Sequence, residues 1–487
     1  MKKYRITAFA AAALMLLSGC GNDPVKDPAV TGESVETVDP NTPPSEVVSL
    51  ESAHYKITND KLAYFFYKDY YDAVSAYYDS YYSAYGLDPT KDLKDQTYRD
   101  GTWFDHFMAV TVRNVMNYLY FAEAAADAGL TLDDADRESI DAEIEDIKSA
   151  AEEFGLSFRE FLDSRFGEGL SEKALRECLE LYRLSDKQYD AVYSSVNVTD
   201  ADMEEYYSEH KESFLYVDYR MVEIRADQAE YADDDARIAG FAEGERQARY
   251  IEASANIDEY VERGVAYYKS INDSLEQPLT DDEIFVKVTN IVMQYEYNDK
   301  SAFGKWAFSG DRKSGDIVML DNGAGIYTVY YLENAPYRKE NATKNYRYLV
   351  FDSEEKAIEA FESFKSGEMT GEAFAALSEG REQELGNGAL QENTDLGETV
   401  PAVEAWLFDP SRKPGDCEIR EYNGSSFLVF FEGDGEISWK LSAKNAIVSE
   451  AVNKTFAEYQ GKYEIKSNID NAYLISGENA FTESGQN

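Results

Sequence analysis

Apolar residues recur at helical spacing through the first half of the chain, from Thr58 to about Ser213. One stripe holds residues three and four positions apart, which share one face of a helix: Tyr67, Tyr71, Val74, Tyr78, Tyr81 and Tyr85. Such a stripe packs against a core, and Gly86 is suited to end the helix. Three tyrosines lie off the stripe, and we expect them to face water or a binding partner: Tyr70, Tyr77 and Tyr82.

Five further helices are expected in the same region, because their starts and ends carry capping residues. The second helix is predicted at about Trp103–Ala128, before Gly129, and the third runs from about Thr131 to Gly155. The N-caps of the next three helices are Ser157, Ser171 and Thr199. We therefore predict that residues 56–213 form an all-α domain.

The second half of the chain contains an internal repeat with an offset of one hundred residues. Trp306-Ala307-Phe308, followed by Arg-Lys-Ser-Gly-Asp, returns as Trp406-Leu407-Phe408, followed by Arg-Lys-Pro-Gly-Asp. An Asn-Gly pair marks a hairpin turn in each copy, at Asn322-Gly323 and at Asn423-Gly424. The same offset pairs strand residues of the two copies: Tyr327 with Phe427, Val329 with Val429, and Tyr331 with Phe431.

Each copy also contains an earlier strand, Tyr219–Val222 in the first and Tyr346–Leu349 in the second. The order of strand, helical stretch, Trp-x-Phe turn and hairpin indicates an α+β domain that occurs twice. We place the first copy at residues 214–338 and the second at residues 344–437. The first copy is expected to carry a long acidic helical insertion, from about Ala229 to Ser270.

Residues 438–487 are interpreted as a last helix and a tail. The helix is predicted from about Ser442 to Lys462, with apolar positions at Ile447, Ala451, Phe456 and Tyr459. We expect this helix to return to the N-terminal helices and the final residues to be disordered.

The first twenty residues carry the features of an export signal. Lys2, Lys3 and Arg5 supply positive charge, and Ile6–Leu17 is an apolar run too short to span a bilayer comfortably. Leu17-Ser18-Gly19-Cys20 resembles the lipobox of bacterial lipoproteins. Residues 1–19 would then be a signal peptide, Cys20 the lipidated residue and residues 20–55 a flexible tether. The alternative is an ordinary signal peptide in which Cys20 is incidental.

The net charge and the residue counts exclude some classes of partner and of functional site. Asp and Glu number 94 against 47 Lys and Arg, and the formal charge of −47 would repel the phosphates of nucleic acid. The sequence shows no phosphate loop, His-based metal spacing or nucleophile motif, so we expect no cofactor and no metal. Asp233-Asp234-Asp235 lacks the spacing of a calcium loop and is interpreted as a solvated helix face. Cys178 is expected in a core and, since Cys417 lies in another predicted domain, without a disulfide partner.

Three stretches, taken in order, resemble the PrsA/SurA-type extracytoplasmic foldases. They are Leu132–Leu184, which includes Gly169-Leu170-Ser171-Glu172; Val198–Phe214; and Ala373–Ser378, followed by Asp395-Leu396-Gly397 and Pro414-Gly415-Asp416. The resemblance implies a helical chaperone module followed by two parvulin-type peptidyl-prolyl cis-trans isomerase domains. It also implies that the partners are unfolded or newly exported proteins at the outer face of the cell membrane.

The chain departs from that family at the catalytic positions. The family's isomerase site places two histidines on neighbouring central strands. The first position falls on Met221 and Tyr348, and the residues nearest to the second are Tyr327 and Ser426. No histidine follows His210 in the sequence, so we assign no catalytic residue and expect both parvulin-like domains to be degenerate.

Three functions remain in competition. The first is a membrane-anchored chaperone or foldase that holds newly exported proteins. The second is an active isomerase, because an apolar pocket that strains the imide bond lowers its rotational barrier without imidazole. The third is a ligand-binding lipoprotein of a transporter, which predicts a two-lobed α/β chain with parallel strands.

The lipobox generates a direct prediction. Substitution Cys20→Ser should block lipid attachment, because only the thiol accepts the diacylglyceryl group. Fractionation of cells and immunoblotting should show either uncut precursor or protein shed into the medium. Mature-sized protein that still fractionates with membrane would contradict the lipobox interpretation.

Overall fold

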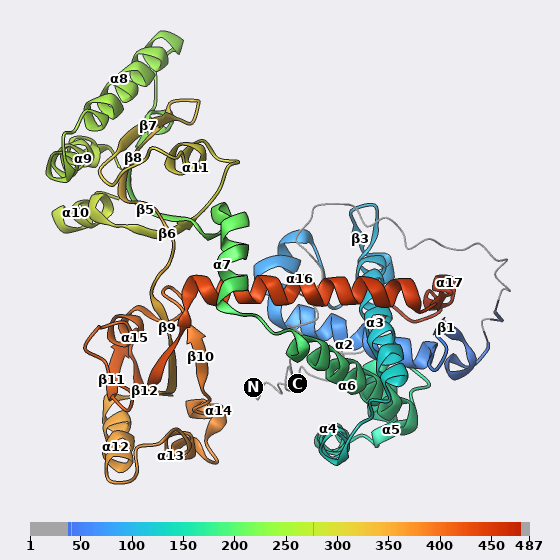
Figure 1. Ribbon diagram of the computed structural model, residues 1–487. Coiled ribbons are helices and arrows are strands. Elements are labelled where there is room, and N and C mark those ends of the chain that lie inside the picture. Colours follow the sequence, from blue (N-terminus) through green and yellow to red (C-terminus); the bar gives the residue numbers. More distant parts are fainter. Residues whose placement is uncertain (1–37, 40, 276, 479–487) are drawn as a thin grey trace. The chain divides into compact units, whose positions relative to one another are not determined.

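A computed structural model describes residues 38–39, 41–275 and 277–478 of the chain (Figure 1). Cys20, the signal peptide and most of the predicted tether lie outside the described residues, as do the final residues 479–487. The chain divides into two compact units. The helical unit is formed by residues up to Asn197 and from Val448 onward, and the sheet unit is Val198–Ile447. No helix of the described part is long and apolar enough to cross a membrane.

The helical unit contains the predicted helices, and most of their caps are confirmed. Ser157 and Glu160 form a capping box, Ser171 accepts a hydrogen bond from the Ala174 amide, and Gly129 ends its helix in the left-handed conformation. The helices are α2 (Asn59–Tyr77), α3 (Trp103–Ala128), α4 (Asp134–Glu153), α5 (Phe158–Phe166) and α6 (Glu172–Ser195). Short helical turns lie at η1 (Pro44–Glu46), η2 (Tyr78–Tyr82), η3 (Ser83–Tyr85) and η4 (Leu93–Asp95).

The core of this unit is rich in large aromatic side chains. Phe66 of α2, with Trp103 and Phe104 of α3, is completely buried, and Cys178 of α6 belongs to the same core as predicted. Full burial of each such ring contributes about 1.5–3 kcal/mol, so the packing of α2 on α3 accounts for much of the unit's stability.

Strands from both ends of the chain join the helical unit. β1 (Val48–Glu51) pairs with β2 (Lys56–Thr58) and with β13 (Lys466–Ser467), while β3 (Thr97–Tyr98) and β4 (Gly101–Thr102) form a separate hairpin. Val47 and Leu50 are buried, so the tether predicted at residues 20–55 is wrong in its last part. The pattern was missed because this strand is too short to show a period.

The end of the chain also returns to this unit, as predicted. Helix α16 (Ser438–Lys462) starts before the predicted Ser442, and Phe456 stacks on Phe121 with ring centroids 5.5 Å apart. Beyond it, α17 (Ile469–Ala472) supplies Asn471, whose side-chain amide donates to the Val48 carbonyl at 2.8 Å.

The sheet unit begins with α7 (Asp200–Glu209), which we had predicted as part of the helical domain. Thr199 caps it as expected, but its buried Met203 packs with Phe214 and Trp439 in a small core of the sheet unit. The short turns of this unit are η5 (Lys211–Phe214), η6 (Ala226–Gln228), η7 (Asn272–Ser274) and η8 (Ala376–Ser378).

Two four-stranded antiparallel sheets follow, with the same strand order (Figure 1). The first has the order β6-β5-β8-β7, with β5 (Tyr216–Arg225), β6 (Val292–Glu296), β7 (Ile317–Asp321) and β8 (Ile326–Tyr337). The second has the order β10-β9-β12-β11, with β9 (Ala342–Phe351), β10 (Gln391–Thr394), β11 (Cys417–Tyr422) and β12 (Ser425–Ile437). The internal repeat of the sequence therefore corresponds to a repeated sheet topology.

Helices accompany each sheet. The first copy contains α8 (Asp234–Glu252), α9 (Ile257–Ile271), α10 (Asp281–Thr289) and α11 (Ala302–Ala307). The second contains α12 (Glu354–Lys365), α13 (Gly371–Ala375), α14 (Glu382–Leu385) and α15 (Pro401–Leu407). The predicted acidic insertion is the pair α8 and α9, and its buried Ala248, Ile251 and Tyr260 pack against the sheet.

The tryptophans of the repeat occupy equivalent corners. The Arg312 guanidinium lies 5.2 Å from the ring centre of Trp306, and that of Arg412 lies 4.7 Å from the ring centre of Trp406. Gly315 and Gly415 both have a φ of 93°, which favours glycine. This corner places α11 and α15 against the same face of their sheets.

The offset of one hundred residues is wrong in the last strand. Ile317 pairs with Tyr331 across the first hairpin, whereas Cys417 pairs with Phe430 across the second. The first hairpin loop is therefore one residue longer, and Tyr331 corresponds to Phe430. Since successive strand residues face opposite sides, each pair predicted from the constant offset joins residues on opposite faces: Tyr327 with Phe427, Val329 with Val429, and Tyr331 with Phe431.

Candidate functional site

The positions expected for the first of the two missing histidines lie on the sheet face that carries the short helix, α11 or α15. Met221 of β5 pairs with Tyr330 of β8, and Tyr348 of β9 pairs with Val429 of β12. Tyr348 packs with the core beneath α15, while the Met221 side chain is 42% exposed.

The second positions that we predicted, Tyr327 and Ser426, lie on the opposite face. Tyr327 belongs to the core under α8 and α9, and Ser426 pairs with Phe351, which belongs to the core under α12. Thr328 follows Tyr327 and Phe427 follows Ser426, and these two residues share a face with Met221 and Tyr348. None of these side chains carries the imidazole of the family's hydrogen-bonded histidine pair.

Aromatic rings fill this face in the first copy. Phe303 of α11 stacks on Tyr330 with ring centroids 4.1 Å apart, and Tyr219 lies 4.5 Å from Phe303. These three rings pack closely and fill the space between α11 and the sheet.

Smaller residues stand at the same places in the second copy. Val403, three residues before Trp406, corresponds to Phe303, and Val429 corresponds to Tyr330. A pocket of about 360 Å³ opens here. Its lining combines apolar and polar side chains: Tyr346, Tyr348, Gln391, Gly397, Glu398, Thr399, Val400, Val403 and Phe427.

A second pocket of about 210 Å³ adjoins the first, because Tyr348 and Gln391 line both. Its other lining residues come from β9, α14 and the loop before β10: Val350, Glu384, Leu385, Gly386, Asn387 and Ala389. The pair of pockets follows the β9–β10 side of the second sheet.

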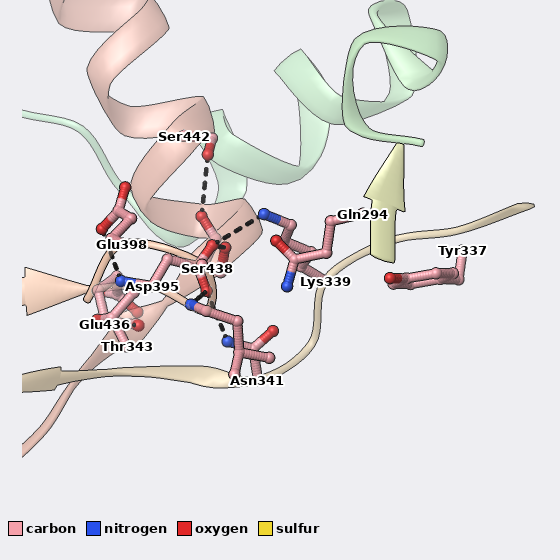
Figure 2. A network of polar contacts seen from close by, with 12 residues as sticks. Gln294, Tyr337, Lys339, Asn341, Thr343, Asp395, Glu398, Glu436, Ser438 and Ser442 are labelled. Atoms are coloured by element: carbon pink, nitrogen blue, oxygen red, sulfur yellow. Dashed lines mark hydrogen bonds and ion pairs between the residues drawn. The ribbon is translucent and has the colours of Figure 1, made fainter. Parts of the chain in front are cut away.

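Polar contacts fix the loop that forms one wall of the larger pocket (Figure 2). The carboxylate of Asp395 accepts hydrogen bonds from the Ser438 hydroxyl at 2.5 Å and the Asn341 amide at 2.8 Å, and it lies 3.1 Å from the Lys339 ammonium. The Asp395 amide donates to Glu398 at 2.8 Å, which closes the turn leading to Thr399.

Burial alone would raise the pKa of Asp395, but hydrogen bonds from Ser438, Asn341 and the Leu396 amide, with the charge of Lys339, outweigh it. The pKa of Asp395 is therefore below its ordinary value. A carboxyl group whose pKa is lowered by folding stabilises the fold above its unfolded pKa, and this stabilisation is lost as the pH falls through the folded pKa.

The three tyrosines proposed to face a partner do not share one surface. Tyr70 is only 1% exposed and makes an edge contact with Phe107, so its assignment to a binding surface is wrong. Tyr82 is partly buried against Trp103, while Tyr77 is 56% exposed.

Two tyrosines of the predicted core stripe are exposed instead. The stripe ends at η2, a π-helical turn, in which the Ser83 amide donates to the Tyr78 carbonyl. This turn takes up one more residue than an α-turn and rotates the following side chains away from the core. Tyr81 is 37% and Tyr85 56% exposed, with their ring centroids 4.6 Å apart. Tyr77, Tyr81 and Tyr85 are called the tyrosine patch below.

Other candidate groups have structural roles. Asp233 caps α8 by accepting the Ala236 amide at 2.8 Å, and the described residues contain no group of His, Cys, Asp and Glu that would hold a metal ion. Cys178 and Cys417 are free thiols, and burial raises the pKa of both, that of Cys417 to about 12. Neither thiol is a reactive nucleophile at neutral pH.

The chain matches no protein-family model and no curated protein. Among solved structures, the chain is similar to one from a study that describes PEB4 and the periplasmic protein Cj1289 of Campylobacter jejuni as two structurally related SurA-like chaperones. The sequence identity is 10%, the match covers 87% of this chain and 99% of that chain, and the TM-score is 0.20. It is also similar to the foldase protein PrsA of Streptococcus pneumoniae, with 12% identity, coverage of 50% and 79%, and a TM-score of 0.18. At these TM-scores the likeness carries no argument about this chain.

The Asp395 network generates a prediction. Substitution Asp395→Asn should lower the free energy of unfolding at pH 7 by about 1–3 kcal/mol, because it removes charged hydrogen bonds from a half-buried site. The difference from the wild type should shrink at pH 3, which lies below the usual pKa of an unfolded aspartate, because the stabilisation that comes from the lowered pKa of folded Asp395 is lost progressively there.

Chemical denaturation at both pH values measures this difference. The matched control is Asp352→Asn, which removes an exposed carboxylate paired with Lys356 and should change stability by less than about 0.5 kcal/mol. An equal effect of both substitutions would show that the network does not support the loop.

Proposed function

We propose that the protein is an extracytoplasmic chaperone, anchored at the membrane by lipid on Cys20, that holds newly exported polypeptides while they fold. The observation that carries the proposal is the open pocket of the second copy, on the sheet face that holds Tyr348 at the first expected histidine position and Phe427 next to the second, Ser426. Such a site binds an apolar segment without supplying acid–base chemistry. The first copy, whose equivalent face is filled by Phe303 and Tyr330, acts as a scaffold.

The tyrosine patch supplies a second binding surface. Tyrosines offer large, rigid contact area with a polar end, so they bind many sequences without strict shape requirements. Tyr81 and Tyr85 pack on each other, while Tyr82 holds the turn against Trp103. This arrangement presents aromatic rings to solvent from a fixed base.

A weak isomerase is the second candidate, and the same pocket favours it. Tyr348 and Gln391 can donate hydrogen bonds to a polypeptide carbonyl, and an apolar wall of Val400 and Val403 suits a prolyl ring. The transporter alternative predicted parallel strands, whereas every strand pair among the described residues is antiparallel.

The tyrosine patch can be tested by substitution. The triple variant Tyr77→Ser, Tyr81→Ser, Tyr85→Ser should weaken the affinity for an unfolded client about tenfold or more, since each aromatic contact contributes about 0.5–1.5 kcal/mol. The measurement is light scattering of an aggregating client at increasing concentrations of the full-length protein.

The control replaces two exposed tyrosines outside the patch, Tyr193→Ser and Tyr250→Ser, whose side chains are 44% and 53% exposed. We expect the control to suppress aggregation as the wild type does, and both variants to keep the wild-type melting temperature. Unchanged suppression by the triple variant would exclude the patch as a client surface.

Catalysis is tested separately, by following cis-to-trans relaxation of a proline peptide with the full-length protein. Uncatalysed exchange takes tens to hundreds of seconds, so modest acceleration is measurable. We expect a rate near the uncatalysed one. Any small acceleration should disappear in Val403→Phe, which places at the pocket wall the residue type of Phe303. Because Val403 is only 1% exposed, thermal melting must show that this variant remains folded. Acceleration typical of an ordinary parvulin would replace the chaperone proposal by the isomerase alternative.

A further inference from the structure

The two pockets of the second copy form one binding surface with two different halves. The larger pocket has an apolar wall that contains Val400, Val403 and Phe427, and the smaller one is lined by Glu384 and Asn387. Tyr348 and Gln391 line both pockets, so a polypeptide with proline in the larger pocket can continue along the sheet to the smaller one.

The charge of this surface is one-sided. Glu384 lines the smaller pocket and Glu398 the larger, while no Lys, Arg or His is among the described residues that line either. The Glu384 carboxylate lies 3.2 Å from the Arg381 guanidinium, but both side chains are half exposed, at 55% and 47%, so a ligand cation can share or displace this pair.

Three cations outside the pocket linings lie on the same sheet face: Lys344, Arg412 and Arg420. Lys344 pairs with Asp434, and the Arg412 guanidinium lies 3.5 Å from the Asp416 carboxylate. Arg420 of β11 pairs with Phe427, but its guanidinium is 3.0 Å from the Glu418 carboxylate and donates to the Ala402 carbonyl at 3.2 Å. Its charge is therefore already balanced within the protein.

We propose that this surface selects proline segments in which a residue beside the proline is Lys or Arg, and disfavours those with Asp, Glu or a phosphorylated residue there. This inference rests on the proposed client-binding role of the pocket and adds its substrate class. A cation gains attraction from Glu384 and Glu398, whereas an anion is repelled by both carboxylates, because the exposed Arg381 offsets the charge of Glu384 only in part.

The experiment measures binding of fluorescent peptides to the full-length protein by anisotropy. The peptides are identical except for Lys, Ala or Glu at the positions on either side of one proline. We expect the Lys peptide to bind about fivefold more tightly than the Glu peptide at low salt, with a smaller difference at high salt. Val403→Phe should weaken binding of all three peptides.

Variants separate a local effect from the protein's overall negative charge. The double variant Glu384→Gln, Glu398→Gln should abolish the preference for Lys, whereas Glu359→Gln, Glu421→Gln, which removes two exposed carboxylates outside the pockets, should keep it. Both double variants remove the same formal charge, so only the position differs. Circular dichroism and thermal melting confirm that each variant is folded.

Each contrary result has a distinct meaning. Equal binding of the Lys and Glu peptides, with both weakened by Val403→Phe, overturns the charge preference and leaves the client pocket intact. A preference that survives Glu384→Gln, Glu398→Gln also overturns it, because the preference then arises elsewhere. Binding that Val403→Phe does not affect overturns both the preference and the role of the pocket.

Discussion

Each of the two sheets carries a short helix on one face, and the side chains between helix and sheet decide whether that face is filled or open. The backbone there is set by the tryptophan corner, with Arg312 over Trp306 in one copy and Arg412 over Trp406 in the other. With the helix held in the same place, Phe303 and Tyr330 fill the space, whereas Val403 leaves it open. One repeated fold thus has a filled face in the first copy and an open face in the second.

One wall of the pocket on the open face is a loop without regular secondary structure. The pocket keeps its shape only if this loop is stable. Asp395 stabilises this loop, because its carboxylate accepts hydrogen bonds from Ser438 and Asn341 and lies beside the positive charge of Lys339. A rigid wall limits the entropy lost on binding, so a modest pocket retains useful affinity. The tyrosine patch of the helical unit is an exposed aromatic surface, and in the proposed function it makes weak contacts with many sequences.

Features that depend on a few adjacent residues were predicted correctly. The capping residues Ser157, Ser171 and Thr199 fixed helix starts, and Trp306 and Trp406 revealed the repeat, because caps and turns depend on a few adjacent residues. Predictions of which side chains share a face were wrong where one additional residue in a hairpin loop or a helical turn changes the side on which the following side chains lie. The longer hairpin of the first copy broke the constant offset, so that Tyr327 corresponds to Ser426 and not to Phe427, and the π-helical turn η2 exposed Tyr81 and Tyr85.

Other features depended on contacts between distant parts of the chain. The burial of Leu50 depends on pairing with Ser467 at the other end of the chain, which no local pattern indicates. Tyr70 is buried because α2 meets α3 there, through Phe107. The pocket itself follows from a substitution that the sequence does show, valine at 403 against phenylalanine at 303, but its meaning requires the correct alignment of the strands.

The central claim is that the second copy binds polypeptide and the first does not. Hydrogen–deuterium exchange of the full-length protein, with and without an unfolded proline-containing client, tests it most directly. The account predicts slower exchange with client in 397–407 and around Tyr348, and no change in α11 or around Met221. Protection of α11 and Met221, with the second copy unaffected, would contradict the account.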